Sequence, residues 1–355
     1  MDNLIIGSGF SSMCCHSLLS KNNVKIISPY GKDWDYLSDL NSRRNLSINK
    51  HLKIKSKSLG TVNYKLPKNI YLHDRFSGGG NSEIWGGFFD TTDFTSDQLI
   101  KLSMNGIKFV QLSRNFGVTS NIDGIVQLQC SNHEIIKSSN FIKPDINGFV
   151  IQISNLNDKK KLVKYVQIDS KHFETKEIEV ERVIISCGVI QTIDLLLRSN
   201  IIKPDDILSL EENAYSLSIS LGEKDQPKEN GCVISYKFNR ALSHYLGISS
   251  KLLKNFNPIP LLRIHQHFKN QKRKLFLKVH DLNNIYFKDL ITQKDDENIK
   301  FGDSIHYCNL HINNIKINDI MNKYNNIQGV GMSFVSQNNP GPISNRIYSD
   351  CLTKI

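Results

Sequence analysis

The first 28 residues constrain the fold more than any other part of the chain. Residues 4–6 form a short apolar run, Gly7 and Gly9 follow, a helical stretch comes next, and residues 24–28 ("VKIIS") form a second apolar run. Strand, glycine turn, helix and strand in this order are typical of the β-α-β unit of a dinucleotide-binding fold. The glycines would let the chain turn sharply and bring N–H groups at the helix start close to a pyrophosphate, whose charge the helix dipole favours.

Two positions depart from the usual pattern of this unit. Ser12 replaces the third glycine of G-x-G-x-x-G, and Ser28 ends the second strand, where an acid usually binds the adenine ribose. Asp33 and Asp35 follow shortly and could take the place of that acid. The segment therefore predicts either a dinucleotide site or an ordinary strand-turn-helix corner.

Composition limits the class of protein. The 355 residues are enough for one large domain or two ordinary ones, and 39% hydrophobic residues support a packed core. No apolar run reaches the roughly 18 residues of a membrane helix. The start, "MDNLIIGSGF", lacks the basic residues and the longer apolar core of a signal peptide. We therefore expect a cytoplasmic protein without an integral membrane segment.

The cysteines and histidines do not indicate a metal site. Seven cysteines are scattered and never spaced as C-x-x-C, which argues against a disulfide scaffold and against zinc. His265 and His267, in "HQH", have no nearby Cys or Glu to complete a ligand set. We expect an ordinary surface strand there.

A formal net charge of +11 comes in part from lysine-rich segments at residues 43–57, 158–164 and 269–274. These segments could attract an anionic substrate, such as a phosphorylated or nucleotide-linked compound. A solvated surface explains them more simply. Aromatic residues are not interleaved with the basic ones, so nucleic-acid binding is not expected.

Alternating and apolar runs predict further strands. Residues 148–155, 161–170 and 173–188 are expected to form strands, and residues 189–200 a helix on whose apolar face Ile193, Leu196 and Leu197 lie. The region from about 201 to 300 is less patterned. It contains two strand-like runs, "PIPLLRIHQHF" and "RKLFLKVHDL".

Residues 77–87 ("SGGGNSEIWGG") place five glycines around one tryptophan. Glycine loses more conformational freedom on folding than any other residue, so such a run needs a physical reason. Either the backbone here approaches a group that is not protein, with Trp85 as an aromatic wall, or the loop passes through a tight crossing.

Three segments occur in the order seen in flavin-dependent oxidoreductases of the glucose–methanol–choline type. They are "LIIGSG" near the N-terminus, "GGGNSEIWGG", and "VIISCGVIQTIDLLLRSN" at residues 183–200. The chain resembles a short and divergent member of this family. The resemblance implies an α/β fold, in which a Rossmann-type FAD-binding domain is interleaved with a smaller α+β substrate domain containing an antiparallel sheet. It places residues 1–90, 120–200 and 301–355 in the FAD-binding domain, and residues 91–119 and 201–300 in the substrate-binding cap.

The resemblance also implies FAD as the cofactor. Members close to pyranose oxidase bind flavin covalently through a histidine where this chain has Ile84, so non-covalent FAD is expected. The residues expected to contact it are Gly7, Gly9, Phe10, Ser11, Ser12, Ser28, Gly79, Gly80, Asn81, Ser82, Trp85, Gly86, Gly87, Val150, Cys187, Gly188, Asn339 and Pro340.

Alcohol oxidation needs a base for the hydroxyl proton while a hydride leaves for the flavin N5, and a group that holds the oxygen. By resemblance, "GDSIHYCNLH" makes His306 the candidate base, and its ordinary pKa of about 6.5 suits that role. "QNNPG" makes Asn339 its partner, with Pro342 in the first turn of a closing helix. His306 could instead be a buried strand residue and Asn339 a turn residue, and His311 is a second candidate base.

The leading hypothesis is an FAD-dependent dehydrogenase that oxidises a CH–OH group of a small molecule, expected to be a sugar or a sugar-linked or anionic derivative. The chain is shorter than typical family members, which would leave the pocket more open. One alternative is a flavoenzyme that performs a reduction or a redox-neutral conversion. Another is a non-catalytic member that binds an anionic partner, which the changes at Ser12 and Ser28 favour.

Overall fold

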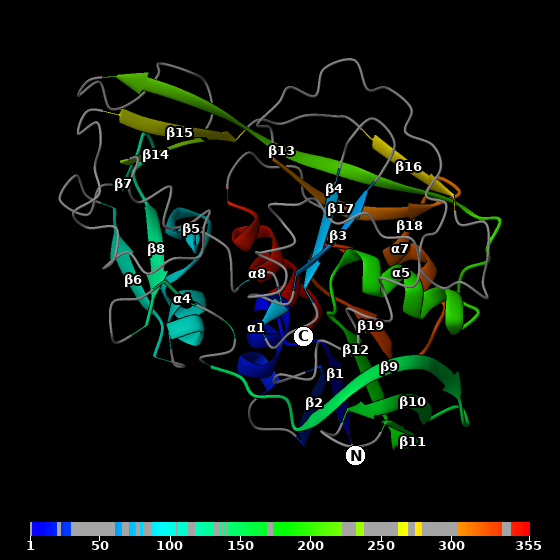
Figure 1. Ribbon diagram of the computed structural model, residues 1–355. Coiled ribbons are helices and arrows are strands. Elements are labelled where there is room, and N and C mark those ends of the chain that lie inside the picture. The colour runs from blue at the N-terminus through cyan, green and yellow to red at the C-terminus, as the bar shows by residue number, and fades with distance from the viewer. Residues whose placement is uncertain are drawn as a thin grey trace.

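The computed structural model contains two large β-sheets with helices packed around and between them (Figure 1). The residues it describes are 2–19, 23–29, 61–65, 71–75, 79–80, 82, 87–103, 106–112, 118–130, 135–136, 138, 141–168, 173–221, 232–237, 262–268, 274–278, 304–335 and 342–355.

Five of the strands in the first seven-stranded sheet are parallel and run from β9 to the edge strand β19. In their order across the sheet they are β9 (Ile146–Asn155), β2 (Val24–Ser28), β1 (Asn3–Ile6), β12 (Arg182–Ile185) and β19 (Ile327–Gly329). Numbered along the chain, this order is 3-2-1-4-5, which is the order of a doubly wound α/β sheet. Two antiparallel strands, β10 (Lys161–Ile168) and β11 (Phe173–Val180), extend the sheet beyond β9.

Helices cover both faces of this sheet. They are α1 (Phe10–Leu19), α5 (Val189–Arg198) and α8 (Ile343–Lys354). Successive side chains of a strand point to opposite faces. Leu4 and Ile6 of β1 accordingly pack in one core with α5, whereas Ile5 packs in another core with α1 and α8. A strand covered on both faces is apolar throughout, which explains the uninterrupted run of Leu and Ile in β1.

The second seven-stranded sheet lies across the top of the molecule in Figure 1. Its path is β18 (Ile315–Lys316), β17 (Ser304–Ile312), β13 (Ile207–Leu221), β15 (Leu262–Phe268), β14 (Cys232–Lys237) and β7 (Val118–Ser120), with β16 (Lys274–Lys278) paired to β13. All of its paired strands are antiparallel.

Backbone hydrogen bonds tie the second sheet to the first. The N–H groups of Asn309 and Leu310 on β17 donate to the carbonyl oxygens of Met332 and Ser333, at 2.9 and 2.8 Å. Met332 and Ser333 belong to the turn that directly follows β19. One turn is therefore fixed by both sheets.

Smaller elements complete the described part of the chain. They are the hairpin β3 (Thr61–Lys65) and β4 (Tyr71–Arg75), the three-stranded sheet β5 (Phe88–Asp90), β8 (Ile125–Gln129) and β6 (Lys108–Gln111), and the short helices η3 (Thr91–Asp93), α4 (Ser96–Ser103) and α7 (Ile317–Met321).

The strands expected around residues 4–6, 24–28, 148–155, 161–170 and 173–188, and the helix after them, are present, as is an antiparallel sheet. The division into an FAD-binding domain and a cap stays a prediction. Strand pairing places β17 and β18 in the second sheet, whereas the prediction groups residues 301–355 with the first. The closing helix begins at Ile343, so Pro342 is its N-cap and not part of its first turn.

The expectation of a surface strand at His265 and His267 is wrong. Both residues lie on β15, but they are buried. The ring nitrogens of His265 are each 2.7 Å from a serine hydroxyl, Nε2 from Ser220 and Nδ1 from Ser235. Because serine hydroxyls satisfy the imidazole, this histidine can be buried without a metal ion or a carboxylate.

Candidate functional site

A cavity of about 210 Å³ opens at the carboxyl ends of the parallel strands. Its described lining comes from residues 6–11 after β1, 27–29 at the end of β2, 148–150 on β9, 186–188 after β12, and Gly80, Ser82, Gln191, Leu195, Met332, Ile343 and Ile347. In open α/β sheets, ligands bind at the carboxyl ends where the strand order reverses. That point is β1, whose neighbours are β2 and β12.

Gly7 is required by the close approach of two strand ends. Its φ is +115°, and a Cβ added there would lie 2.6 Å from the carbonyl oxygen of Ser186. Its N–H donates to the carbonyl oxygen of Ile27 at 2.9 Å, and the N–H of Ser186 donates to that of Ile6 at 2.9 Å. The ends of β1, β2 and β12 therefore meet at this glycine.

Ser12 occupies the position of the third glycine without disturbing this packing. It is fully buried, and its hydroxyl is bonded to the hydroxyl of Ser186. The Ser186 hydroxyl donates to the carbonyl oxygen of Ile6 at 3.0 Å, so Ser12 is the donor to Ser186. A hydrogen-bonded serine pair thus joins α1 to the end of β12, where a glycine would allow direct contact.

Ser28 stands at the ribose position of the motif and forms a second hydroxyl pair. Its Oγ is 2.9 Å from the Oγ of Ser8, and both side chains are buried at the cavity wall. The N–H of Gly79 donates to the Ser8 hydroxyl at 3.2 Å. The glycine-rich segment is thereby attached to the first strand-helix turn.

The described part of the glycine-rich segment has backbone that favours glycine. Gly79 and Gly80 have φ of +84° and +52°. The hydroxyl of Ser82 donates to the carbonyl oxygen of Gly79 at 2.6 Å, and the N–H of Ser138 donates to the Ser82 hydroxyl at 3.1 Å. These bonds hold Gly80 and Ser82 at the cavity.

Gly87 lies elsewhere, because a Cβ on it would be 2.8 Å from the Cγ2 of Ile135 and 3.2 Å from the carbonyl oxygen of Leu128. It is not among the described lining residues. Its surroundings are protein, as expected for a tight crossing. A tight crossing is thus shown at Gly87, while the approach of the backbone to a group that is not protein stays a prediction for Gly79 and Gly80.

The third motif supplies the opposite wall. Cys187 and Gly188 follow β12, and Gly188, with φ of +82°, is the N-cap of α5. Val150, on β9, completes this side. The three separated motifs therefore converge on one cavity, and Gly7, Gly9, Phe10, Ser11, Ser28, Gly80, Ser82, Val150, Cys187 and Gly188 of the expected contact residues line it.

Several expected site residues lie outside the described residues. They are Asn81, Trp85, Gly86, Asn339 and Pro340, together with Ile84, Asp33 and Asp35. The backbone of His306 is described: it lies on β17 opposite Asn213 of β13. His306 is three residues before Asn309, whose N–H binds the cavity residue Met332.

His311, the second candidate base, is buried and already engaged. Its Nδ1 is 2.9 Å from the carbonyl oxygen of Asn309, and its Nε2 is 3.7 Å from Oε1 of Glu211. The other carboxylate oxygen of Glu211 accepts a hydrogen bond of 2.7 Å from the side-chain amide of Asn309. Asn309 has φ of +50°, which brings its carbonyl and its side chain to the two neighbours.

The α8 helix carries a buried cation, Arg346, whose pKa is influenced by Glu211, the partner of His311. Arg346 is 5% exposed, and its Nε has no hydrogen-bond partner within the described part of the chain. Burial raises the pKa of the Cys308 thiol to about 11, against the attraction of the positive charge of Arg346. Burial also lowers the pKa of Arg346, against the attraction of Cys308 and Glu211. Cys308 is therefore a protonated, unreactive thiol at neutral pH.

Sequence reasoning did not identify the turn after β19 as part of the cavity. Gly331 has φ of +89°, and a Cβ there would be 2.8 Å from the hydroxyl oxygen of Ser11. Met332 follows it at the cavity wall. The pair Gly329 and Gly331 is the signal that could have indicated this close approach, since a Cβ on Gly329 would collide with the ring of Phe334.

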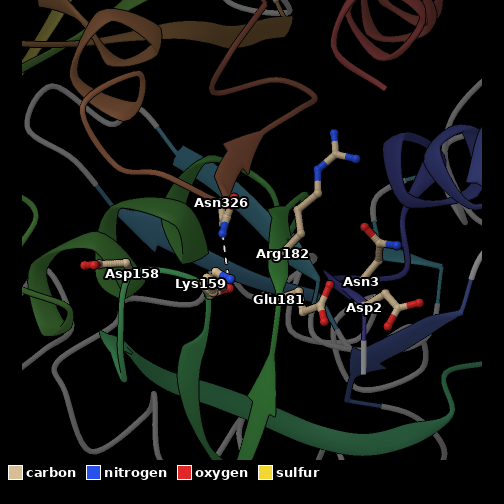
Figure 2. A pocket seen from close by; sticks show the side chains of 7 residues that line it. All are labelled: Asp2, Asn3, Asp158, Lys159, Glu181, Arg182 and Asn326. Atoms are coloured by element: carbon tan, nitrogen blue, oxygen red, sulfur yellow. Dashed lines mark hydrogen bonds between the residues drawn. The ribbon is translucent and has the colours of Figure 1, made fainter.

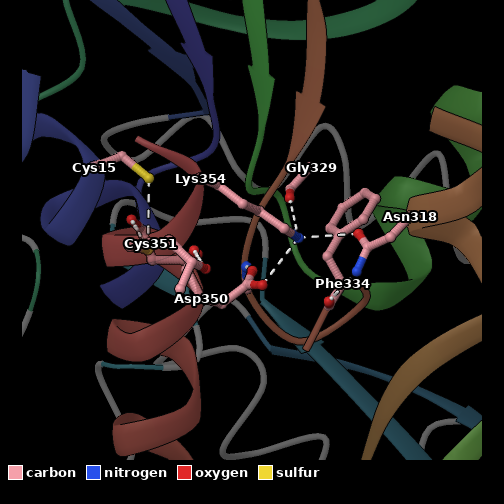
Figure 3. Close-up of polar contacts among 10 residues, drawn as sticks. Cys15, Asn318, Gly329, Phe334, Asp350, Cys351 and Lys354 are labelled. Carbon is pink, nitrogen blue, oxygen red and sulfur yellow. Dashed lines mark hydrogen bonds and ion pairs between the residues drawn. The ribbon is translucent and has the colours of Figure 1, made fainter. Parts of the chain in front are cut away.

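Lys354 fastens this turn to the end of α8 (Figure 3). Its Nζ donates to the carbonyl oxygen of Gly329 at 2.8 Å and to Oδ1 of Asn318 at 2.9 Å, and it lies 2.9 Å from Oδ1 of Asp350. It also lies 5.4 Å from the centre of the Phe334 ring. Burial raises the pKa of Asp350 in spite of the attraction of Lys354.

A second, more open hollow of about 430 Å³ lies at the opposite, amino ends of the strands. Figure 2 shows its lining: Asp2, Asn3, Asp158, Lys159, Glu181, Arg182 and Asn326. Asn3 and Arg182 begin the parallel strands β1 and β12. Ligands of open α/β sheets bind at the other end, so the smaller glycine-lined cavity is the better candidate site.

Two general properties follow from the described residues. None of their helices has the length and apolar character needed to cross a membrane. They also contain no group of three or more His, Cys, Asp or Glu side chains placed to hold a metal ion.

Comparison with known proteins does not assign a family. No protein family and no curated protein matches the sequence. Among solved structures, a flavoprotein/dehydrogenase from Cytophaga hutchinsonii is similar over 78% of this chain, with 11% sequence identity and a TM-score of 0.27. The match covers 66% of that protein, just under two thirds of its length. A TM-score this low carries no argument for a shared fold, so function has to be argued from the cavity itself.

Proposed function

We propose that the chain is an FAD-dependent oxidoreductase that oxidises an alcohol group of a sugar or sugar derivative. One observation carries this proposal: a glycine-lined cavity whose described lining is uncharged lies at the carboxyl ends of a 3-2-1-4-5 parallel sheet, beside the first turn of α1. This is the place and the chemistry that a dinucleotide pyrophosphate requires.

The first turn of α1 offers donors for an anion. The first helical hydrogen bond runs from the N–H of Met13 to the carbonyl oxygen of Gly9. The N–H groups of Ser11 and Ser12 precede this bond and have no partner within the helix. No charged side chain is found among the described lining residues, so backbone N–H groups and serine hydroxyls would hold the phosphates.

The size of the cavity suits part of FAD. Pockets for whole cofactors and drug-sized ligands are about 300–1,000 Å³, larger than the 210 Å³ found here. We assign the described cavity to the pyrophosphate and the adjoining ribose. The isoalloxazine end would lie toward Met332 and α8, with Asn81 and Trp85 of the glycine-rich segment contributing.

FAD would supply the acceptor for the hydride that leaves the alcohol carbon. His306 would take the hydroxyl proton on its imidazole, and Asn339 would hold the same oxygen by a hydrogen bond. The contacts of His311 argue against it for this task, because its two ring nitrogens face the carbonyl of Asn309 and the carboxylate of Glu211. The Nδ1–H of His311 is used by this carbonyl, and its Nε2 is buried beside a carboxylate.

The first experiment tests the cofactor. The purified chain is expected to show flavin absorbance, and the denatured protein to release FAD identified by mass. The Gly9→Ala variant tests FAD binding without disturbing the fold. Its Cβ would lie 3.8 Å from the carbonyl oxygen of Gly79, which is an ordinary contact, and Gly9 does not have a positive φ. We expect a change in stability below about 1 kcal/mol but at least tenfold weaker FAD binding. A colourless protein that takes up no FAD would rule the proposal out.

The second experiment tests the base. His306→Gln should remove substrate-dependent bleaching of the flavin while FAD remains bound, and His311→Gln should lower thermal stability while the bleaching persists. If His306→Gln turns over normally, the assignment of the base is wrong, although the cofactor assignment stands.

A further inference from the structure

We propose that Arg346 binds a carboxylate of the substrate, so that the alcohol which this chain oxidises is a hydroxy acid, such as a sugar acid. The proposal rests on the proposed oxidoreductase function. It adds the chemical class of the substrate and the residue that selects it.

The guanidinium of Arg346 is buried without an ion pair. Arg346 is 5% exposed, and its Nε has no hydrogen-bond partner among the described residues. None of the ion pairs within the described part of the chain includes Arg346. Buried charges in proteins are normally paired, because an isolated charge loses its hydration without compensation. An anion from outside the described chain would supply the missing partner.

Glu211 attracts this guanidinium, but its two carboxylate oxygens are engaged elsewhere. One accepts a 2.7 Å hydrogen bond from the side-chain amide of Asn309, and the other lies 3.7 Å from Nε2 of His311. Burial lowers the pKa of Arg346 more than the attraction of Glu211 raises it. The positive charge is therefore incompletely compensated by its described neighbours.

Arg346 lies next to the wall of the glycine-lined cavity. It is three residues after Ile343 and one before Ile347 on α8, and both isoleucines line the cavity. Residues three apart are neighbours on a helix surface. On the β17 side, Asn309 donates its N–H to the cavity residue Met332 at 2.9 Å. A ligand that extends from the cavity between α8 and β17 can therefore reach the guanidinium.

Asn309 provides a hydrogen-bond acceptor in the same place. Its Oδ1 is buried and has no hydrogen-bond partner within the described chain, whereas its amide nitrogen is used by Glu211. Asn309 directly follows Cys308, whose thiol feels the charge of Arg346. A guanidinium donates to an anion, and an amide oxygen accepts from a hydroxyl. The pair therefore fits a ligand that carries a carboxylate and a hydroxyl close together.

Charge balance favours a carboxylate over a phosphate. A carboxylate brings one negative charge, which one guanidinium neutralises. A phosphate group brings about −1.5 to −2 at neutral pH, and the neighbouring Glu211 adds to the negative charge. None of the described cavity-lining residues supplies a second cation. A phosphate would therefore leave an uncompensated negative charge in a buried place.

The test uses glycolate and glycolamide on the full chain as purified. Glycolate is the smallest hydroxy acid, and glycolamide has nearly the same shape without the charge. A ligand that binds only the folded chain raises the midpoint of thermal unfolding, so this midpoint is measured against probe concentration at constant ionic strength. We expect glycolate to bind at least about tenfold more tightly than glycolamide.

Two arginine variants assign the preference to its residue. Arg346→Met keeps a long apolar side chain without the charge, and should bind the two probes within about twofold of each other. Without a probe it should unfold at the same or a higher temperature than wild type, because an unpaired buried charge has been removed. Arg198→Met removes an arginine that pairs with Asp194 on α5 and should leave the preference for glycolate unchanged.

Equal binding of the two probes to wild type, or a preference that persists in Arg346→Met, would overturn the inference. So would a marked loss of stability in Arg346→Met, because a protein group would then be pairing with the guanidinium. Flavin absorbance of the same samples separates the two proposals. Bound flavin without a preference for glycolate refutes the carboxylate site alone, and an Arg346-dependent preference in a chain that takes up no flavin refutes the oxidoreductase alone.

Discussion

Replacing Gly7 by alanine tests the most constrained point of the site. The added Cβ would lie 2.6 Å from the carbonyl oxygen of Ser186 and 2.9 Å from the Cα of Cys187. Both are backbone atoms, so no side chain can rotate to make room and the end of β12 must move. Such overpacking costs about 1–3 kcal/mol, and holding alanine at a φ of +115° adds about 1–3 kcal/mol.

Gly106 provides the matched control. Its φ is +78°, but a Cβ there would meet nothing within 4 Å. Gly106→Ala should therefore lower the free energy of unfolding only by the cost of holding alanine at a positive φ, about 1–2 kcal/mol. Both substitutions restrict the unfolded chain equally, which cancels in the comparison. The difference between the two variants contains the steric part, about 1–3 kcal/mol, and any extra backbone cost of φ +115° over +78°, so it should be at least about 1 kcal/mol.

Urea unfolding followed by circular dichroism measures this difference. A lower midpoint at unchanged slope reports lost stability and not an altered unfolded state. We expect Gly7→Ala to unfold at the lower urea concentration and to lose flavin as well. A Gly7→Ala protein that is as stable as Gly106→Ala would refute the reasoning, because the added Cβ would then fit between the ends of β1 and β12 without a steric cost.

Three further changes have definite expectations. Asn345→Ala should cost about 1–3 kcal/mol in urea unfolding, because its amide exchanges 2.8 Å hydrogen bonds with both backbone groups of Asp90, which would be left unpaired in a partly buried place; a loss below about 1 kcal/mol would contradict this role. Ser12→Gly, which restores the usual motif, should lower stability by about 1–2 kcal/mol through a lost hydrogen bond and weaker helix propensity, and flavin titration should show no gain in affinity. Asp350 binds its proton more tightly in the folded chain because burial raises its pKa, so its contribution to stability is present at low pH and is lost as pH rises through the folded pKa. The stability difference between wild type and Asp350→Asn, measured by urea unfolding across pH 4–8, should therefore fall with rising pH, and a difference that grows would contradict the assignment.

The sequence predicts the first sheet because its signals are local. Period-two alternation and apolar runs identify β1, β2 and β9 to β12, and paired glycines identify the turns between strand and helix. The same local signals also select ten of the 22 described residues that line the cavity, since the first and third motifs follow the carboxyl ends of β1 and β12.

What the sequence does not predict depends on contacts between distant segments. Nothing in "HQH" indicates that serines of two neighbouring strands, Ser220 and Ser235, satisfy the ring of His265 and allow its burial. Similarly, Ser12 is tolerated only because Ser186, 174 residues away, accepts its proton. The contribution of Met332 depends on strand β17, which holds the turn through the carbonyl oxygens of Met332 and Ser333.

The contact between α1 and α8 has a consequence for how this molecule is made. Cys15 and Cys351 are 336 residues apart in the chain, but their buried sulfur atoms are 3.6 Å apart. Ile347 and Tyr348 of α8 fill the same core as Phe10 and Met13 of α1. The core between these two helices therefore closes only when segments 336 residues apart in the chain have met, so we expect it to form late in folding. A protein cut between the two helices would expose part of the apolar side of α1, which is a target for proteases.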